Sequence, residues 1–230
     1  MYYKFPSTPY IFLDNSIQKK EKNYLTDSEI KEFLSKNITI EEKIDGANLG
    51  ISFDCNGNIL LQNRGEFLKE PFYGQWKPLK QWINLHEDEL FDVLADRYIL
   101  YGEWCYACHS VKYDCLPDWF LTFDIYDKKN EKFLSVQKRD MKIKSTTLSI
   151  VPKLGYGMWR KEELPDFFSI SKVGSTNSEG IYLRLDSDDW LLKRAKMVRP
   201  EFRQQIEEHW SRKPLEKNRL LMQSTLTMKM

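Results

Sequence analysis

The sequence predicts an α+β fold, with antiparallel sheets flanked by helices and a short helical appendage at the C-terminus. Two observations support this class. Short segments rich in β-branched and aromatic residues recur along the chain, and turn residues join two pairs of them. Residues 76–94 differ, because their apolar side chains recur at helical spacing. No internal repeat or low-complexity linker interrupts the chain, which favours one main domain over residues 1–200 and a basic helical tail over residues 201–230.

Local sequence predicts the other elements in order. Residues 1–13, which contain Pro6 and Pro9, are expected to form an extended arm. The β-branched and apolar segments predict strands at 38–40, 49–53, 59–64, 98–104, 119–126, 148–151, 179–185 and 190–198. Asn56-Gly57-Asn58 is typical of a hairpin turn between the second and third of these strands. Helices are also expected at 27–34, which has an acidic first turn, at 137–145, which is basic, and at 201–210 after Pro200.

Composition and charge limit the class of protein. The chain has 230 residues, of which 41% are hydrophobic and 30% charged, as in an ordinary soluble globular protein. Its 35 basic and 34 acidic residues leave a net charge of +1, so any phosphate-binding surface must come from local segregation of charge. The start lacks the apolar core of a signal peptide, and no apolar run approaches the roughly 18 residues of a membrane span. We therefore expect a cytoplasmic protein with no membrane partner.

The cysteines allow two interpretations. Cys105, Cys108, His109 and Cys115 are close in sequence and could suggest a metal site. A structural zinc site usually takes two separate pairs of ligands, whereas here a single short segment supplies them all. Reduced thiols near a core strand are the favoured interpretation, and a metal-binding regulatory protein remains a distant alternative.

A lysine lies among carboxylates in Glu41-Glu42-Lys43-Ile44-Asp45-Gly46-Ala47-Asn48, where a predicted strand meets a turn. A desolvated lysine near neutral pH can act as a nucleophile rather than only as a charge. Four further motifs follow, centred on Arg64, Glu103, Phe123 and Glu179. A cationic segment, Leu192-Lys193-Arg194-Ala195-Lys196-Met197-Val198-Arg199, ends the series. A glutamate such as Glu103, inside an apolar strand, should be paired or functional because burying an unpaired charge is costly.

These motifs, in this order, resemble those of the nucleotidyltransferase superfamily, which includes DNA ligases, capping enzymes and ATP-dependent RNA ligases. The stretch Glu42-Lys43-Ile44-Asp45-Gly46-Ala47-Asn48 is most similar to RNA ligases that seal nicked duplex RNA and to their small bacterial and phage relatives. The resemblance covers roughly residues 5–200. It implies a nucleotidyltransferase domain of the ATP-grasp-like ligase type. About thirty residues follow Arg199, too few for the OB-fold that DNA ligases and capping enzymes carry.

The resemblance also implies a role for each motif residue. Lys43 would attack the α-phosphorus of ATP, with Arg194 and Lys196 contacting the α-phosphate from one face of a strand. Lys193 is the other option for the first of these two cations. Glu179 and Asp45 would hold Mg²⁺ or Mn²⁺. The implied ATP contacts are Glu42 and Ile44 at adenine, Arg64 at the ribose and phosphate, Glu103 at a ribose hydroxyl, Phe123 as the stacking ring, Asn48, Lys43 and Lys196. His109 has a counterpart in these relatives, and a structural role is our default for it.

The implied reaction has three steps: formation of a lysyl-AMP, transfer of AMP to a 5′-phosphate end, and attack by a 3′-hydroxyl that releases AMP. Burial, Arg194 and Lys196 are expected to lower the pKa of Lys43, and Asp45 and Glu42 to raise it unless a metal offsets them. RNA is favoured over DNA as the partner, and an end-healing kinase or phosphatase could complete the pathway. A minimal DNA ligase, a stand-alone adenylyltransferase and a catalytically silent nucleotide- or RNA-binding module remain alternatives.

Overall fold

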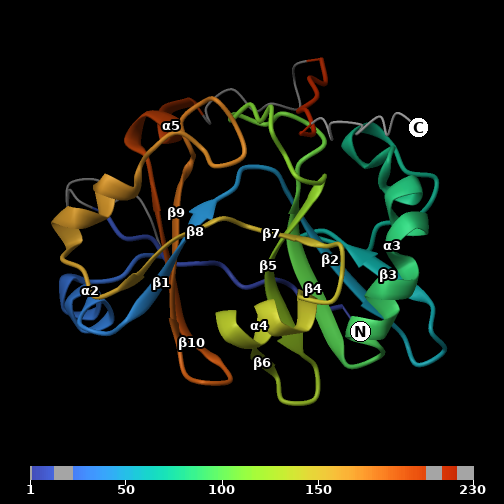
Figure 1. Cartoon of the computed structure of the whole chain (residues 1–230), viewed down its shortest axis with the longest axis horizontal. Coiled ribbons are helices and arrows are strands. Elements are labelled where there is room, and N and C mark those ends of the chain that lie inside the picture. The colour runs from blue at the N-terminus through green and yellow to red at the C-terminus, as the bar shows by residue number, and fades with distance from the viewer. Residues whose placement is uncertain (1, 13–22, 206–213, 222–230) are drawn as a thin grey trace, which may run out of the picture.

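Two antiparallel sheets stand side by side (Figure 1). Helices α2 (Asp27–Leu34) and α3 (Leu79–Leu94) lie on their outer sides, and α4 (Val136–Ile143) lies between them in this view. This computed structural model describes residues 2–12, 23–205 and 214–221. None of the helices in these ranges is long and apolar enough to cross a membrane. The α+β class predicted from the sequence is confirmed.

The first sheet has the strand order β10-β9-β1-β8. Its strands are β1 (Ile38–Lys43), β8 (Lys153–Gly157), β9 (Gly180–Asp186) and β10 (Leu191–Val198). Helix α2 (Asp27–Leu34) buries its apolar face against this sheet, together with the 3₁₀ segment η2 (Lys161–Phe167). Thr26 begins α2 with a capping box, because its side chain accepts from the Glu29 amide and the Glu29 carboxylate accepts from the Thr26 amide.

The second sheet follows the order β3-β2-β4-β5-β6, with the short β7 (Ser149–Ile150) parallel to β5. Its other strands are β2 (Ala47–Phe53), β3 (Ile59–Gln62), β4 (Tyr98–Trp104), β5 (Phe120–Asp127) and β6 (Lys132–Phe133). Helix α3 (Leu79–Leu94) packs its buried leucines and Trp82 on this sheet, as its helical spacing predicted. Helix α4 (Val136–Ile143) and the 3₁₀ turn η1 (Gly74–Trp76) complete this half of the fold.

The N-terminal arm crosses from one sheet to the other. Near its start, the Tyr3 ring stacks on Tyr126 at 3.9 Å between centroids, and the Tyr3 carbonyl accepts from Gln62 of β3. Near its end, the Ile11 amide donates to the Lys196 carbonyl, and the Lys196 amide donates to the Pro9 carbonyl. The arm is extended, as predicted, and it fastens the edge of β10 to the second sheet.

The sequence missed some elements and misplaced others. It did not predict β6, β8 or η2; β8 contains two glycines in five residues, a composition of low strand propensity. Strand β3 ends at Gln62 rather than at residue 64, because Asn63 forms a turn in which its side-chain oxygen accepts from the amides of Gly65 and Glu66. Helix α5 is described over Pro200–Gln205, and the remainder of the predicted 201–210 helix lies outside the described residues.

Residues 214–221 of the predicted helical tail are extended instead. They pair with the loop formed by residues 105–116, through bridges from Ala107 to Lys217 and from Leu116 to Leu220. Asn218 lies at the centre of this contact: its side chain accepts from the Tyr113 amide at 2.8 Å and donates to the carbonyls of Cys105 and Ala107. We call residues 214–221 the C-terminal strap.

Candidate active site

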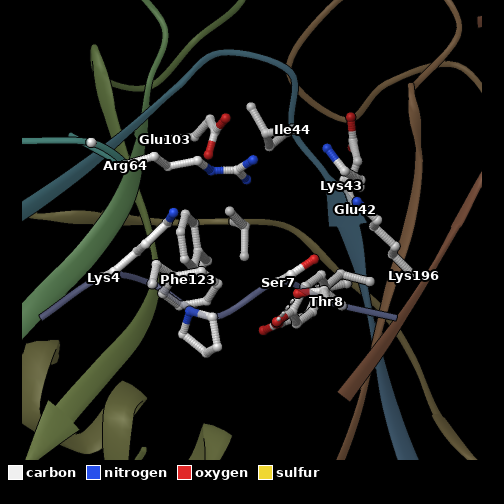
Figure 2. Close-up of a pocket in the computed structure, with 16 residues that line it drawn as sticks. Lys4, Ser7, Thr8, Glu42, Lys43, Ile44, Arg64, Glu103, Phe123 and Lys196 are labelled. Carbon is white, nitrogen blue, oxygen red and sulfur yellow. Dashed lines mark hydrogen bonds between the residues drawn. The ribbon is translucent and has the colours of Figure 1, made fainter. Parts of the chain in front are cut away.

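A cavity of about 400 Å³ lies between the two sheets, within the size range of ligand pockets. Strands β1, β9 and β10 form one wall, β4 and β5 form the other, and residues 4–8 of the arm close it. In Figure 2, Arg64, Glu103 and Phe123 lie on one side and Lys43 and Lys196 on the opposite side. Seven of the residues predicted from the motifs line this first cavity: Glu42, Lys43, Ile44, Arg64, Glu103, Phe123 and Lys196.

A second cavity, of about 530 Å³, adjoins the first on the side of the Lys43 amine. Lys43, Arg64, Glu103 and Lys196 belong to the walls of both cavities. The remaining predicted residues of the second cavity are Asp45, Asn48 and Glu179, and it also contains Gln75, Trp76 and His109. Lys43 therefore stands at the boundary between two adjoining spaces.

Lys43 is the last residue of β1 and pairs with Glu179, whose carboxylate lies 2.5 Å from the Lys43 amine. Burial lowers the pKa of Lys43, but attraction to Glu179, Glu103 and Asp45 outweighs burial, and the net shift is upward. The charged form of the amine is therefore favoured. Of the residues expected from the sequence to shift this pKa, Asp45 raises it, whereas Arg194, Lys196 and Glu42 are not among its main causes.

The side chains of Glu42 and Arg194 make their contacts with other residues rather than with Lys43. The Glu42 carboxylate accepts from the Ser171 hydroxyl at 2.5 Å and from the Lys172 amide at 2.8 Å, so only its main chain is left for the cavity. Arg194 donates to Asp124 at 3.2 Å and lies over the Phe133 ring at 4.1 Å. Strand alternation does place Arg194 and Lys196 on one face, as predicted, but Arg194 lines neither cavity.

Lys193, the other option for a phosphate-contacting cation, points outward to Glu32 at 3.3 Å. Lys196 lines both cavities, and its amine lies 4.0 Å from the centre of the Tyr10 ring. The turn at Asn63 directs Arg64 into the cavities. Lys196 and Arg64 are thus the two predicted cations, besides Lys43, that the structure brings together.

The acidic residues around Lys43 repel one another. Burial raises the pKa of Glu103 to about 7, although Lys43 and Arg64 oppose this shift. Burial, aided by the charge of Asp45, raises the pKa of Glu179 to about 7 against the opposing effect of Lys43. A cation entering this region would relieve the repulsion.

The loop of residues 105–116 holds Asp45. One oxygen of the Asp45 carboxylate accepts from the amides of Ser110 at 2.7 Å and Val111 at 2.9 Å. The Asp45 amide donates to the Tyr113 hydroxyl at 2.8 Å. Sequence reasoning missed Tyr113 and the strap residue Asn218 behind it, since neither belongs to a motif.

Asn48 and His109 lie in the wall of the second cavity. The Asn48 side chain is buried, and neither its nitrogen nor its oxygen finds a hydrogen-bond partner among the described residues. His109 shares a 2.9 Å hydrogen bond with Gln75, in which the donor depends on the tautomer. The buried amide of Asn48 is thus left unsatisfied among the described residues, beside the second cavity.

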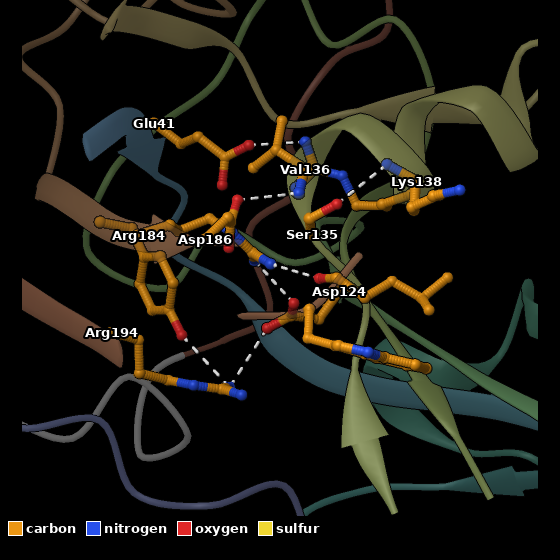
Figure 3. Close-up of polar contacts among 12 residues, drawn as sticks. Glu41, Asp124, Ser135, Val136, Lys138, Arg184, Asp186 and Arg194 are labelled. Atoms are coloured by element: carbon orange, nitrogen blue, oxygen red, sulfur yellow. Dashed lines mark hydrogen bonds and ion pairs between the residues drawn. The ribbon is translucent and has the colours of Figure 1, made fainter. Parts of the chain in front are cut away.

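A buried ionic network that includes Glu41, Asp124 and Arg184 lies next to the first cavity (Figure 3). Arg184 pairs with Asp124 at 2.6 Å, and Arg139 pairs with Glu41 at 2.6 Å. Both arginines also donate to the Phe123 carbonyl, at 2.7 Å from Arg139 and 3.0 Å from Arg184. The network joins β1 and β9 of the first sheet to β5 of the second and holds Phe123 at the cavity wall.

The cysteines are free throughout the described part of the chain. Burial raises the pKa of the Cys105 thiol, and Cys105 and Cys108 make weak hydrogen bonds to main-chain carbonyls. Residues 105–116 instead serve as the loop that holds Asp45.

The sequence model of the RNA ligase family matches residues 36–198, which include Lys43, Arg64, Glu103, Phe123, Glu179 and Lys196. The chain belongs to the RNA ligase family. A search of curated proteins found no match.

Solved structures of an RNA ligase from Naegleria gruberi share this fold. A lysine-to-alanine variant with ATP and Mn superposes with a TM-score of 0.63 at 19% identity, over 78% of this chain and 55% of that chain. A lysine-to-methionine variant with AMP and Mn has a TM-score of 0.60 at 18% identity, over 79% of this chain and 55% of that chain. The form with pyrophosphate has a TM-score of 0.62 at 18% identity, over 78% of this chain and 55% of that chain. The likeness establishes the fold, and the chain spans a little over half the length of these relatives.

Proposed function

We propose that this chain is an ATP-dependent RNA ligase that joins 3′-hydroxyl and 5′-phosphate ends through a lysyl-AMP on Lys43 and an adenylated 5′ end. The single observation that carries this proposal is the position of Lys43 between two adjoining cavities. One cavity, with the Phe123 ring in its wall, suits a nucleotide. The other has room for the second reactant. The ATP, AMP and pyrophosphate in the Naegleria gruberi RNA ligase structures support the same assignment.

In the first step, the neutral Lys43 amine attacks the α-phosphorus of ATP. A nitrogen–phosphorus bond forms, the bond from the α-phosphorus to the bridging oxygen breaks, and pyrophosphate leaves with the electron pair. Glu179, whose carboxylate lies 2.5 Å from the Lys43 amine, would be the nearest group able to accept the proton that Lys43 loses before the cation binds. Lys196 and Arg64 are placed to stabilise negative charge that develops on the phosphates.

A divalent cation fits the chemistry of this site. No group of three or more Asp, Glu, His or Cys side chains within the described residues is arranged to bind an ion directly. Mg²⁺, however, usually keeps several waters and uses one or two carboxylates together with substrate phosphates. Glu179 and Asp45, the predicted metal residues, would hold such a hydrated ion. Once bound, it would neutralise phosphate charge and offset the carboxylates that raise the pKa of Lys43.

In the second and third steps, a polynucleotide end would occupy the second cavity. Its 5′-phosphate oxygen attacks the phosphorus of the lysyl-AMP and releases Lys43. The 3′-hydroxyl then attacks the 5′-phosphate and expels AMP. Lys196 and Arg64, which line this cavity, are the cations that would contact these phosphates. We propose RNA ends as the substrate, an end-healing kinase or phosphatase as the enzyme that prepares them, and the cytoplasm as the compartment.

Incubation with α-labelled ATP and Mg²⁺, followed by denaturing gel electrophoresis, tests the first step. Wild type is expected to retain label, and Lys43→Ala to retain none. Lys193→Ala is a matched control, since Lys193 is exposed on β10 of the same sheet and pairs with Glu32. Absence of label on wild-type protein that has been freed of preloaded AMP would contradict the ligase mechanism and favour a nucleotide-binding module.

A second assay separates RNA ligation from DNA ligation. Nicked duplexes that differ in one sugar, ribose or deoxyribose at the 3′ side of the nick, would be offered to the labelled enzyme. Sealing that requires the 2′-hydroxyl supports the RNA ligase. Equal sealing of both duplexes would support a minimal DNA ligase, and label that never leaves Lys43 for either end would support an adenylyltransferase with another substrate.

A further inference from the structure

The N-terminal arm contacts Lys196 through three consecutive residues. The Lys196 amide donates to the Pro9 carbonyl at 2.9 Å, and the Ile11 amide donates to the Lys196 carbonyl at 2.8 Å. Tyr10, which lies between them, forms a parallel bridge with Lys196. Directly paired residues of neighbouring strands project from the same face, so this register places the Tyr10 ring beside the Lys196 side chain.

The Tyr10 ring contacts the charged end of Lys196. The amine lies 4.0 Å from the centre of the ring, within the range of a cation–π contact. Both residues line the second cavity, and Lys196 also lines the first. Figure 2 shows Lys196 on the same side of the first cavity as Lys43. Tyr10 therefore contacts a cation that stands, like Lys43, at the boundary between the two spaces.

The ring is itself held in place. It stacks on the Phe12 ring, with 5.2 Å between the centroids and 11° between the planes. The Tyr10 amide donates to the Asn23 carbonyl at 3.0 Å, and the Tyr10 carbonyl accepts from the Leu25 amide at 2.9 Å. Main-chain bonds on both sides of the arm thus fix the residue that supports Lys196.

A lysine in a cavity wall needs such support. Its charge sits on a flexible four-carbon stem, and fixing this stem costs conformational entropy. A contact that orients the amine before the ligand binds reduces this cost. An aromatic face attracts an ammonium group through its quadrupole and carries no net charge. Unlike a carboxylate, the ring therefore orients Lys196 without neutralising the charge that a phosphate would meet.

We propose that Tyr10 is a positioning residue that acts through Lys196: its ring holds the Lys196 amine at the boundary of the two cavities, where the amine can reach the α-phosphate of ATP. The nucleotide need not touch Tyr10 for this effect. The inference rests on the proposed function, because it takes the phosphate at Lys196 from the proposed attack of Lys43 on ATP.

Substitution of the ring tests the inference, with formation of the Lys43 adduct followed by rapid quench. Tyr10→Leu removes the ring but keeps an apolar side chain, and it should lower kcat/KM for ATP about 5- to 30-fold. Tyr10→Phe keeps the ring and should stay within about threefold of wild type. Tyr3→Leu is the matched control and should behave as wild type, because Tyr3 belongs to the same arm but stacks on Tyr126. A Tyr10→Phe protein as slow as Tyr10→Leu would overturn the inference.

A double-mutant cycle separates positioning from a general effect on the fold. In a Lys196→Ala background, Tyr10→Leu should cause no further loss of kcat/KM, since the contact that it removes is already absent. Losses that multiply would contradict the inference, because they would show that Tyr10 supports the protein independently of Lys196.

The contact can also be measured in the wild-type protein without any assay of the reaction. The ring should shift the NMR signal of the Lys196 ε-methylene protons upfield of those of exposed lysines, with Lys196→Arg to assign the signal. An ATP analogue that cannot transfer its α-phosphate should move this signal as the amine turns to the phosphate. An unshifted signal in the ligand-free protein would refute the inference and leave the ligase mechanism intact.

Failure of the proposed function gives a different result. If ATP forms no adduct with Lys43, the ligase mechanism fails, and calorimetric binding of the same analogue still tests Tyr10. Weaker binding to Tyr10→Leu than to wild type and Tyr10→Phe would support the inference by itself. Equal binding to all three proteins would refute it, and an analogue that does not bind wild type would count against both proposals.

Discussion

The Lys43 amine carries a proton, which it must lose before its proposed attack on ATP. Burial alone would favour the neutral amine, but Glu179, Glu103 and Asp45 hold the pKa above its ordinary value. In the proposed reaction, phosphates and a cation would change the charges around this amine and so favour its neutral form.

The pH dependence of the first step follows from this state. The pKa of Lys43 is raised. At any pH below this pKa, raising the pH by one unit increases the neutral fraction of the amine about tenfold. The rate of Lys43 adduct formation at limiting Mg²⁺ should therefore rise from pH 6 to pH 9 without a plateau, and added Mg²⁺ should raise it most at the low end. Rapid-quench measurement of the labelled enzyme checks this, and a flat profile with chemistry rate-limiting would contradict it.

Glu103 predicts a pH dependence of stability in the ligand-free protein. Its pKa is raised from 4.5 in the unfolded chain to about 7 in the fold. Between these values the folded state binds more protons, so the free energy of unfolding falls as pH rises through this window. Relative to wild type, Glu103→Gln should gain on the order of 1 to 3 kcal/mol between pH 4.5 and pH 8. Urea melts of both proteins across this range measure the difference, and parallel pH profiles would argue against the assigned pKa.

Among single residues, those that belong to a sequence motif could be identified from the sequence. Lys43, Arg64, Glu103, Phe123 and Lys196 converge on one cavity as the motifs predicted, while their chemical roles stay predictions. The buried ion pair of Glu41 with Arg139 could not be predicted, because the two residues are 98 positions apart and nothing in either local sequence links them. Arg194 looked like a phosphate contact by spacing alone, and only the fold reveals the competing acid, Asp124.

Among the elements, the strands and helices with strong periodicity were predictable, and those held by tertiary contacts were not. Strand β8 has little propensity of its own and forms because β1 pairs with it from Ile38 to Glu41. The strap of residues 214–221 forms no regular element and is defined by its pairing with the loop of residues 105–116. No periodicity in the sequence could indicate that a tail packs against the loop that positions Asp45.

The strap should matter for both stability and the metal requirement. Asn218→Ala removes three hydrogen bonds at a buried site and should cost about 2 to 4 kcal/mol of unfolding free energy. It should also raise the Mg²⁺ concentration needed for half-maximal adduct formation, because the loop that holds Asp45 loosens. Glu216→Gln, on the exposed part of the strap, should change unfolding by no more than about 0.5 kcal/mol. An unchanged Mg²⁺ requirement in a destabilised Asn218→Ala protein would show that the strap acts on stability alone.

For the molecule as a whole, the first cavity belongs to neither sheet by itself. The ion pairs Glu41–Arg139 and Arg184–Asp124, and the arm that runs from Tyr3 to Ile11, hold the two sheets around it. Phe123 comes from the second sheet and Lys43 and Lys196 from the first, so a nucleotide bound between them adds contacts across the same boundary. Ligand binding should therefore stabilise both halves of the fold together.

An ATP analogue that cannot transfer its α-phosphate tests this coupling. At 100 times its dissociation constant, it should add about 2.7 kcal/mol to the free energy of unfolding. In a chain of this size that corresponds to a rise in melting temperature of about 5 to 10 °C, within one cooperative transition. Lys196→Ala, which alters the walls of both cavities, should require a higher analogue concentration for the same shift, whereas Lys193→Ala should behave as wild type. Two separate transitions, only one of which shifts with the analogue, would show that the sheets unfold independently and that the nucleotide contacts one of them alone.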